Sequence, residues 1–123
     1  MQLDIFSPKA PPLFGLDISS SSVKMLEIVD AGKGTYRVER YVIEPLPRDA
    51  TVDGNISNLE QVVETVKRAM RTVLGSHKNP QVVISSDKLA PYQSVITAMD
   101  AARQLGLERL TFATKQSNGN SSP

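Results

Sequence analysis

The feature that most restricts the fold is one strongly amphipathic helix signal set between short strand-like segments. Apolar residues in the stretch 59–74 recur at i, i+3, i+4 and i+7, which is the spacing of a helix with one apolar face. Ser57 is the predicted N-cap, Glu60 completes a capping box, and Gly75 supplies the stop. The pattern therefore predicts a helix over residues 57–74 that packs its apolar face on other elements.

Five other segments are predicted as strands and one as a second helix. The predicted strands are residues 13–18, 23–29, 35–44, 81–86 and 109–114. The apolar phase slips between Val38 and Tyr41, which indicates a bulge or a strand buried on both faces. The second helix starts near Pro91 and ends at Gly106. Its predicted buried stripe is Tyr92, Val95, Ile96, Met99 and Ala102.

The element order is β-β-β-α-β-α-β, which predicts an α/β domain with a single mixed sheet and two helices. Right-handed crossovers favour the strand order 3-2-1-4-5, with the second strand antiparallel to the rest. This order resembles that of ribonuclease-H-like domains, to which actin-like subdomains belong. We expect a core on both faces of the sheet, but the sequence does not decide whether both helices cover one face. Residues 1–12 are predicted as an irregular arm, 13–115 as a single domain and 116–123 as a disordered tail.

Charge and composition argue against several classes of function. The chain has 123 residues, with 14 basic and 13 acidic side chains and a net charge of +1, so it lacks the basic surface that nucleic-acid binding requires. Cysteine is absent and His77 is the only histidine, which argues against a conventional zinc site. No apolar run approaches the roughly 18 residues of a membrane span, and no signal peptide is recognisable. We therefore expect a cytoplasmic protein without a cofactor or a bound metal.

Two segments in the first part of the chain carry a family resemblance. Residues 14–24 read FGLDISSSSVK and residues 44–47 read EPLP. Both resemble PilM, the actin-like protein of type IV pilus assembly, and the first is similar to the opening phosphate loop of actin-like ATPases. The resemblance implies a vestigial nucleotide site at Asp17, Ser19, Ser20, Ser21 and Lys24.

Only weak nucleotide binding is expected at this loop. Serine replaces the family's loop glycine at position 19 or 20, which lowers the freedom of the backbone to wrap a phosphate. In the family, a second phosphate loop lies downstream of the matched part, and two large domains close on the nucleotide. The same residues also fit a tight β-hairpin loop with an exposed lysine.

The last third of the chain resembles a different family. Residues 82–88 read VVISSDK, residues 91–92 read PY, residues 99–102 read MDAA, and Gly106 follows. These segments are similar to the ExbD/TolR periplasmic domain of proton-driven energy transducers. Because the two families belong to different compartments, the main interpretation is a chimera. It would join residues 13–78 to residues 79–115, by design or recombination, and have no evolved catalytic activity.

Two other interpretations stay open. A natural pilus-assembly adaptor would bind a peptide of a membrane partner, as PilM does. A weak Mg²⁺-dependent nuclease would place carboxylates on the first strand, the first helix and the end of the fourth strand. The residues at those places are Asp17, Glu60 or Glu64, and Asp87. The PilM-like loop, the capping box and the ExbD-like segment account for the same residues without nuclease chemistry.

Several charged or polar residues are predicted to lie at the surface, and the chain is predicted to self-associate. His77 is predicted as a solvent-exposed loop residue, and Lys67, Arg68 and Arg71 as a solvated helix face. A symmetric homodimer is expected over a monomer. It would form by pairing of an exposed sheet edge, or by exchange of the carboxy-terminal β-α-β unit through the hinge at residues 75–80.

Overall fold

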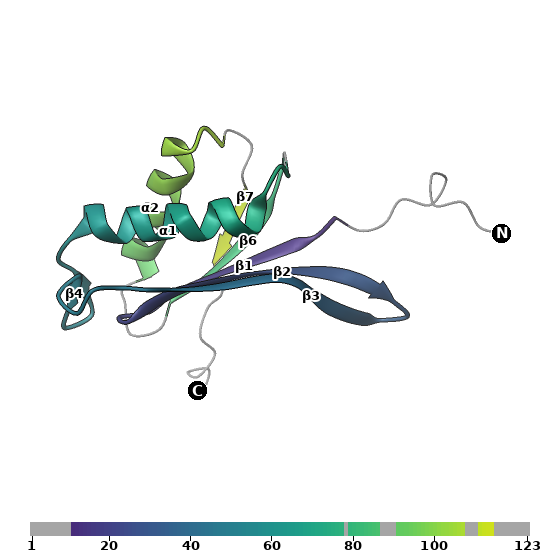
Figure 1. Cartoon of the computed structure of the whole chain (residues 1–123), viewed down its shortest axis with the longest axis horizontal. Coiled ribbons are helices and arrows are strands. Elements are labelled where there is room, and N and C mark those ends of the chain that lie inside the picture. Colours follow the sequence, from purple (N-terminus) through teal and green to yellow (C-terminus); the bar gives the residue numbers. More distant parts are fainter. Residues whose placement is uncertain (1–10, 78, 87–90, 108–110, 115–123) are drawn as a thin grey trace, which may run out of the picture.

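A computed structural model describes residues 11–77, 79–86, 91–107 and 111–114 of the chain. Figure 1 shows a long curved sheet with two helices beside it. The predicted arm lies almost wholly outside the described residues, and the predicted tail lies wholly outside them. The elements are β1 (Leu13–Ile18), β2 (Ser22–Gly32), β3 (Thr35–Pro45), β4 (Thr51–Val52), β5 (Asn55–Ile56), α1 (Leu59–Leu74), β6 (Gln81–Ser86), α2 (Pro91–Gln104) and β7 (Thr111–Thr114).

Five strands form one mixed sheet in the order β3-β2-β1-β6-β7. Strand β2 pairs antiparallel with β1 and β3, whereas β6 pairs parallel with β1 and β7. Parallel neighbours need long crossover connections, and the connections that contain α1 and α2 supply them. The predicted α/β class, strand order and antiparallel second strand are therefore confirmed.

A second, two-stranded sheet was not predicted. Strands β4 and β5 pair antiparallel, with Thr51 opposite Ile56. The turn between them is formed by Asp53 and Gly54, whose φ angles are 53° and 80°. Two successive positive φ angles are typical of the tight hairpin turn that an Asp-Gly pair favours. The Asp-Gly dipeptide was the available signal, but strands of two residues are too short to show an apolar alternation.

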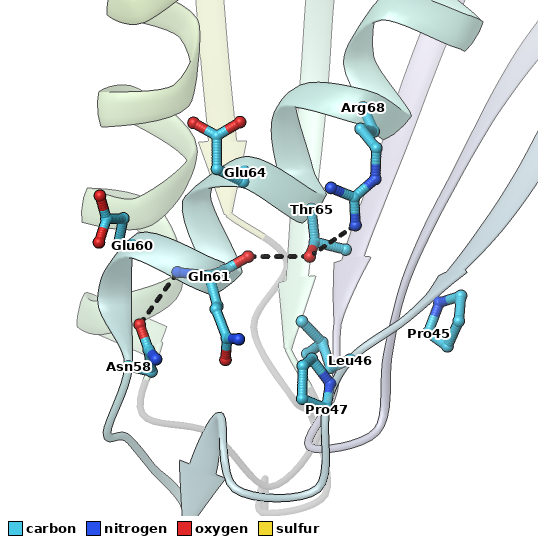
Figure 2. Close-up of a pocket in the computed structure, with 9 residues that line it drawn as sticks. All are labelled: Pro45, Leu46, Pro47, Asn58, Glu60, Gln61, Glu64, Thr65 and Arg68. Carbon is cyan, nitrogen blue, oxygen red and sulfur yellow. Dashed lines mark hydrogen bonds between the residues drawn. The ribbon is translucent and has the colours of Figure 1, made fainter.

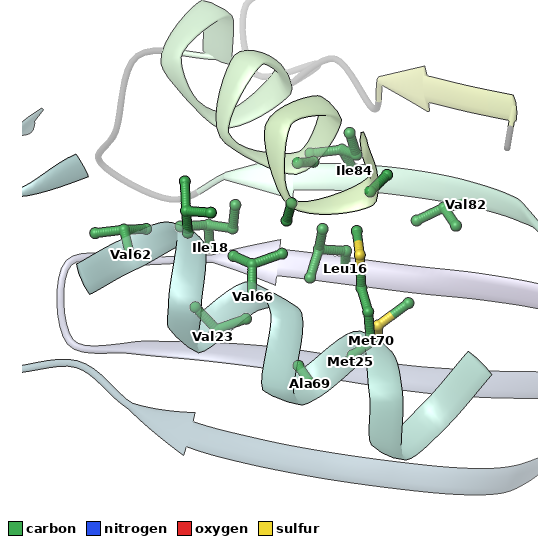
Figure 3. Packing of buried hydrophobic residues seen from close by; sticks show 14 of the residues in the cluster. Leu16, Ile18, Val23, Met25, Val62, Val66, Ala69, Met70, Val82 and Ile84 are labelled. Carbon is green, nitrogen blue, oxygen red and sulfur yellow. The ribbon is translucent and has the colours of Figure 1, made fainter. Parts of the chain in front are cut away.

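The core lies on one face of the five-stranded sheet. In β1, Phe14, Leu16 and Ile18 are buried, while the residues between them are more exposed. Helix α1 packs on β2 and β3, α2 packs on β6, and the two helices contact each other. Figure 3 shows the side chains of α1 meeting those of the strands. The expected core on both faces is wrong for the described residues, because both helices cover the same face (Figure 1).

The irregularity predicted in the third strand is present. The pairing of β2 with β3 runs from Glu27 opposite Arg40 to Ile28 opposite Val38, so Glu39 is an extra residue on β3. A single extra residue restores the alternation of the strand on either side of it. Of the two alternatives predicted from the apolar phase slip between Val38 and Tyr41, a bulge or a strand buried on both faces, the bulge is therefore the correct one.

The start of α1 differs by one residue from the prediction. Asn58, not Ser57, is the N-cap, and its side-chain oxygen accepts a hydrogen bond from the backbone N of Gln61 at 3.1 Å. The Ser57 hydroxyl instead donates a hydrogen bond to the backbone O of Asp49 at 2.6 Å, so it does not cap the helix. The predicted stop is confirmed, since Gly75 follows the helix with a φ of 56°.

The predicted buried stripe of α2 is largely wrong. Tyr92 and Met99 are 75% and 53% exposed, although both were predicted to lie in the core. The buried residues of α2 are Ser94, Thr97, Ala98, Ala101 and Ala102. Small side chains let this helix lie close to β6 and α1. The buried Thr97 hydroxyl has a hydrogen-bond partner, because it donates to the backbone O of Gln93 at 2.7 Å. Burial of the larger side chains would hold the helix farther from the sheet.

Candidate functional site

The predicted phosphate loop connects β1 to β2. It is a tight hairpin in which the backbone N of Ser19 donates to the backbone O of Ser22 at 2.9 Å. The backbone N of Ser22 donates to the Ser19 hydroxyl oxygen at 3.2 Å, and that of Ser21 does so at 3.4 Å. The Ser19 side chain therefore occupies the position where these two N–H groups would otherwise meet an anion.

The backbone of this loop also lacks the form of an anion nest. Anion nests alternate right-handed and left-handed residues. None of residues 19–22 has a positive φ; the non-glycine residues with positive φ in the described part are Lys33 and Asp53. This geometry matches the hairpin interpretation of the loop, and nucleotide binding at Ser19, Ser20 and Ser21 stays a prediction.

Asp17 and Lys24 lie next to each other on β1 and β2, but they line a different surface from the one formed by the serines of the turn. They are directly opposite each other in the β1–β2 register. Both line a hollow of about 320 Å³ whose other lining residues are mostly apolar. By the alternation of each strand they belong to the sheet face that the helices leave uncovered. The structure thus brings together the two charged residues of the predicted site and places its serines beyond them in the turn.

The carboxylates of the nuclease hypothesis do not gather in the described residues. Glu60 and Glu64 are exposed on α1, and Glu64 pairs with Lys67 at 3.0 Å. Asp17 lines the hollow on the uncovered sheet face, and Asp87 lies outside the described residues. Within the described ranges, no group of three or more acidic or histidine side chains has the arrangement of a metal site.

A large pocket of the described structure is an open groove along α1. It has a volume of about 800 Å³ and runs between the first half of the helix and the segment 45–47, which we call the proline segment. Figure 2 shows the proline segment on one side and the helix side chains on the other. The lining residues are Pro45, Leu46, Pro47, Asn58, Glu60, Gln61, Glu64, Thr65 and Arg68.

Hydrogen bonds to the hairpin loop fix the proline segment in place. The backbone N of Leu46 donates to the backbone O of Ser21 at 2.9 Å. The Thr51 hydroxyl donates to the backbone O of Ser20 at 3.1 Å. Leu46 itself is buried and packs with the core. The predicted serine loop therefore acts as a support for the groove.

The helix wall of the groove is held by a chain of polar contacts. The Thr65 hydroxyl donates to the backbone O of Gln61 at 2.8 Å and accepts from Arg68 Nη2 at 3.2 Å. The Nε of Arg68 lies 3.4 Å from a carboxylate oxygen of Glu44 at the end of β3. This ion pair joins the helix to the sheet beside the groove.

Gln61 directs its side-chain amide into the groove. The side-chain amide of Gln61 makes no hydrogen bond to any described residue, and it points toward the proline segment in Figure 2. A primary amide offers two donors and an acceptor. The groove therefore combines prolines and the edge of Leu46 with an amide, which suits the apolar side chains and the backbone of an extended peptide.

Part of the predicted solvated face of α1 is not solvated. The side chain of Lys67 is only 13% exposed. Its ammonium donates to Glu64 and to the side-chain oxygen of Gln104, at 3.0 Å each, and so ties α1 to α2. The prediction failed because Gln104 lies 37 positions away in the sequence.

His77 was predicted as an exposed loop residue, but it is partly buried against β1 and β2. Its ring lies edge-on to Phe14, with centroids 5.1 Å apart. Its Nδ1 donates to the backbone O of Leu74 at 2.7 Å, and its Nε2 lies 3.5 Å from Glu27 Oε2. The other oxygen of Glu27 lies 3.8 Å from Arg40 Nε.

The burial of Glu27 was not predicted either. Its side chain is only 5% exposed, and one carboxylate oxygen has no hydrogen-bond partner among the described residues. The available signal was its spacing, because Glu27 continues the alternation of the buried Val23 and Met25 along β2.

Comparisons with solved structures define the fold class. The type II variant of the Aquifex aeolicus Ppx/GppA phosphatase is 14% identical, with a TM-score of 0.54 over 89% of this chain and 38% of that one. Thermus thermophilus RuvC is 10% identical, with a TM-score of 0.52 over 85% of this chain and 64% of that one. A PilM–PilN type IV pilus biogenesis complex is matched at 15% identity, over 80% of this chain and 31% of that one, with a TM-score of 0.49.

At such low identity these matches bear on the fold alone. They show a ribonuclease-H-like, actin-like α/β subdomain, as predicted. The chain spans little more than a third of the Ppx/GppA structures, 36% in the first of them. Residues 15–104 match the family described as type IV pilus assembly protein PilM, which covers most of the chain. The chain therefore belongs to the PilM family.

The family match bears on the expected chimera. It runs without interruption across the predicted junction at residues 78 and 79 and includes most of the part that was predicted to resemble ExbD/TolR. The comparisons therefore give no support to an ExbD/TolR origin or to a chimera. None of the described helices has the length and apolar character needed to cross a membrane.

Proposed function

We propose that this domain acts in type IV pilus assembly as an adaptor that binds an extended peptide of a membrane partner on the cytoplasmic side. The observation that carries the proposal is the groove between α1 and the proline segment, with the amide of Gln61 directed into it. The PilM family match supplies the biological context.

The chemistry of the groove favours a peptide over a small metabolite. The groove is open. Its walls combine two prolines and a leucine edge with polar side chains, among them the charged groups of Glu60, Glu64 and Arg68, and the Glu44–Arg68 ion pair lies at its side. An extended peptide presents alternating side chains and free backbone groups. Its apolar side chains would lie on Pro45 and Pro47, and its backbone would exchange hydrogen bonds with Gln61.

No catalytic step is part of this proposal. We expect no nucleotide hydrolysis, because the N–H groups of the hairpin loop are directed to the Ser19 hydroxyl. The proposed role of the loop is structural, since two of its carbonyl groups hold the proline segment and the loop before α1.

The test uses short overlapping peptides that tile the PilN protein of the genome that encodes this chain. PilN is the partner in the complex with PilM named above. Binding is measured by fluorescence anisotropy with the full chain. We expect at least one peptide to bind, and Gln61→Ala to weaken it about tenfold by removal of one or two backbone hydrogen bonds.

The matched control is Gln81→Ala, which removes the same side chain from an exposed position at the start of β6. It should leave binding unchanged. Gln61→Ala keeps the cap of α1, because Asn58 bonds the backbone N of residue 61 and not its side chain. Equal binding by the wild type and Gln61→Ala would remove the groove from the proposal, and no binding by any peptide would remove PilN as the partner.

A further inference from the structure

The face of the sheet opposite α1 and α2 is apolar, and no described helix lies on it (Figure 1). Alternation and strand pairing place Leu13, Leu26, Ile28, Val38, Tyr41, Ile43 and Val83 on this face. Val38 and Tyr41 are 54% and 59% exposed. We call these residues the open face. A contiguous apolar surface of this kind is typical of a place where another protein surface binds.

The pattern along β2 indicates what covers the open face. By the alternation of the strand, every second residue from Lys24 to Asp30 belongs to this face, in the order Lys24, Leu26, Ile28 and Asp30. Within β2, the row has a lysine at one end, two apolar residues in the middle and an aspartate at the other end. Such a row is complementary to itself when it is turned end over end, because each lysine then meets an aspartate.

The neighbouring strand β1 is also complementary to itself about the point between Leu26 and Ile28. Leu13 of β1 lies level with Ile28, and Gly15 lies level with Leu26. Gly15 has no side chain, and it lines the hollow of about 320 Å³ on this face. A two-fold axis that crosses β2 between Leu26 and Ile28 would set Leu13 of one copy over the hollow at Gly15 of the other.

Strand β3 is complementary to itself about the same point. Tyr41 lies level with Leu26, and Val38 lies level with Ile28. The same two-fold axis would set Tyr41 of each copy over Val38 of the other. Sheets that pack face to face lie about 10 Å apart, a distance that apolar side chains fill and that a lysine and an aspartate span together.

We propose that this chain forms a symmetric homodimer by packing its open face on the open face of a second copy, with Lys24 of each copy paired to Asp30 of the other. The pairing is isologous, so both ends of the β2 row are satisfied by one contact surface. It differs from pairing of a sheet edge and from exchange of the β-α-β unit. It also leaves the groove along α1 accessible, because the groove and α1 lie on the other side of the sheet.

The charges are available for this pairing. Lys24 and Asp30 are both exposed. One oxygen of Asp30 accepts from the backbone N of Gly32 at 2.8 Å, which orients the carboxylate. An apolar helix from another protein would have no use for opposite charges at the two ends of the β2 row, whereas a second copy uses both.

Charge reversal tests the proposal, with sedimentation velocity of the full chain over a dilution series. We expect a dimer that dissociates on dilution. Lys24→Asp should raise the dissociation constant about tenfold or more, because like charges then face each other at both ends of the interface. The double variant Lys24→Asp with Asp30→Lys should return the constant toward that of the wild type, because the opposite charges meet again.

The control variant is Lys33→Asp, which makes the same charge change in the turn after β2, and it should not alter dimerisation. Far-UV circular dichroism checks that each variant is folded. A chain that is monomeric at all concentrations would overturn the proposal. A dimer that is indifferent to Lys24→Asp would assign the contact to a sheet edge or to an exchanged unit, and a double variant that is no stronger than the single one would remove the Lys24–Asp30 pairing.

Discussion

The one-sided core makes a sharp prediction for two adjacent residues of β2. Met25 is 1% exposed beneath α1, and Leu26 is partly exposed on the open face. Met25→Ala should lower the free energy of unfolding by about 3 kcal/mol, because it removes buried atoms and leaves a cavity. Leu26→Ala should cost about 1 kcal/mol, roughly half of what full burial of a leucine is worth, and it leaves no closed cavity.

The difference can be measured by urea denaturation followed by far-UV circular dichroism, since the chain has no tryptophan. The protein concentration is kept low enough for the chain to be monomeric, because dimerisation would add to the effect of Leu26→Ala. Both variants should keep the slope of the wild-type transition and shift its midpoint. Equal losses for the two variants would contradict the assignment of the core to one face of the sheet.

Three further predictions concern the helix ends and the buried carboxylate. Asn58→Ala should lower stability by about 1 kcal/mol through loss of the cap of α1, as measured by the same denaturation. Gly75→Ala should cost about 1–3 kcal/mol, because the φ of 56° strains any side chain and the new methyl would lie 3.2 Å from Arg40. Glu27→Met should be neutral or stabilising in thermal melts, since it replaces a buried charge by an apolar side chain of similar size, whereas a large loss would show that the contacts with Arg40 and His77 stabilise the fold.

The five strands of the main sheet were predictable because alternation and glycine or proline breaks are local signals. Strands β1 and β6 were predicted with their exact bounds, and the bulge at Glu39 lies within the predicted phase slip between Val38 and Tyr41. The strand order followed from the rule on right-handed crossovers, which depends on the order of elements alone.

The errors have a common cause, which is that packing partners far away in the sequence decide burial. Apolar periodicity assigned Tyr92 and Met99 to the core, but close packing of α2 selects the small face with Thr97 and Ala98. The burial of Lys67 depends on Gln104 of the other helix. Such contacts carry no local signal.

The groove along α1 could not be predicted from the sequence either. Residues 44–47 were considered only for their family resemblance, and Gln61 was not singled out. Only the fold sets the proline segment opposite the first turns of α1. The serine loop was predicted as a phosphate site, whereas in the structure its backbone accepts a hydrogen bond that holds the proline segment.

The central claim, that the groove along α1 binds a peptide of a pilus partner, is tested most directly by amide chemical-shift mapping. The isotope-labelled full chain is titrated with the PilN peptide that binds most strongly in the anisotropy assay. We predict that the largest shifts fall on Leu46, on residues 58–65 and on the side-chain amide of Gln61. Shifts confined to the open face around Leu26 and Tyr41, with the amide of Gln61 unmoved at saturation, would contradict the account.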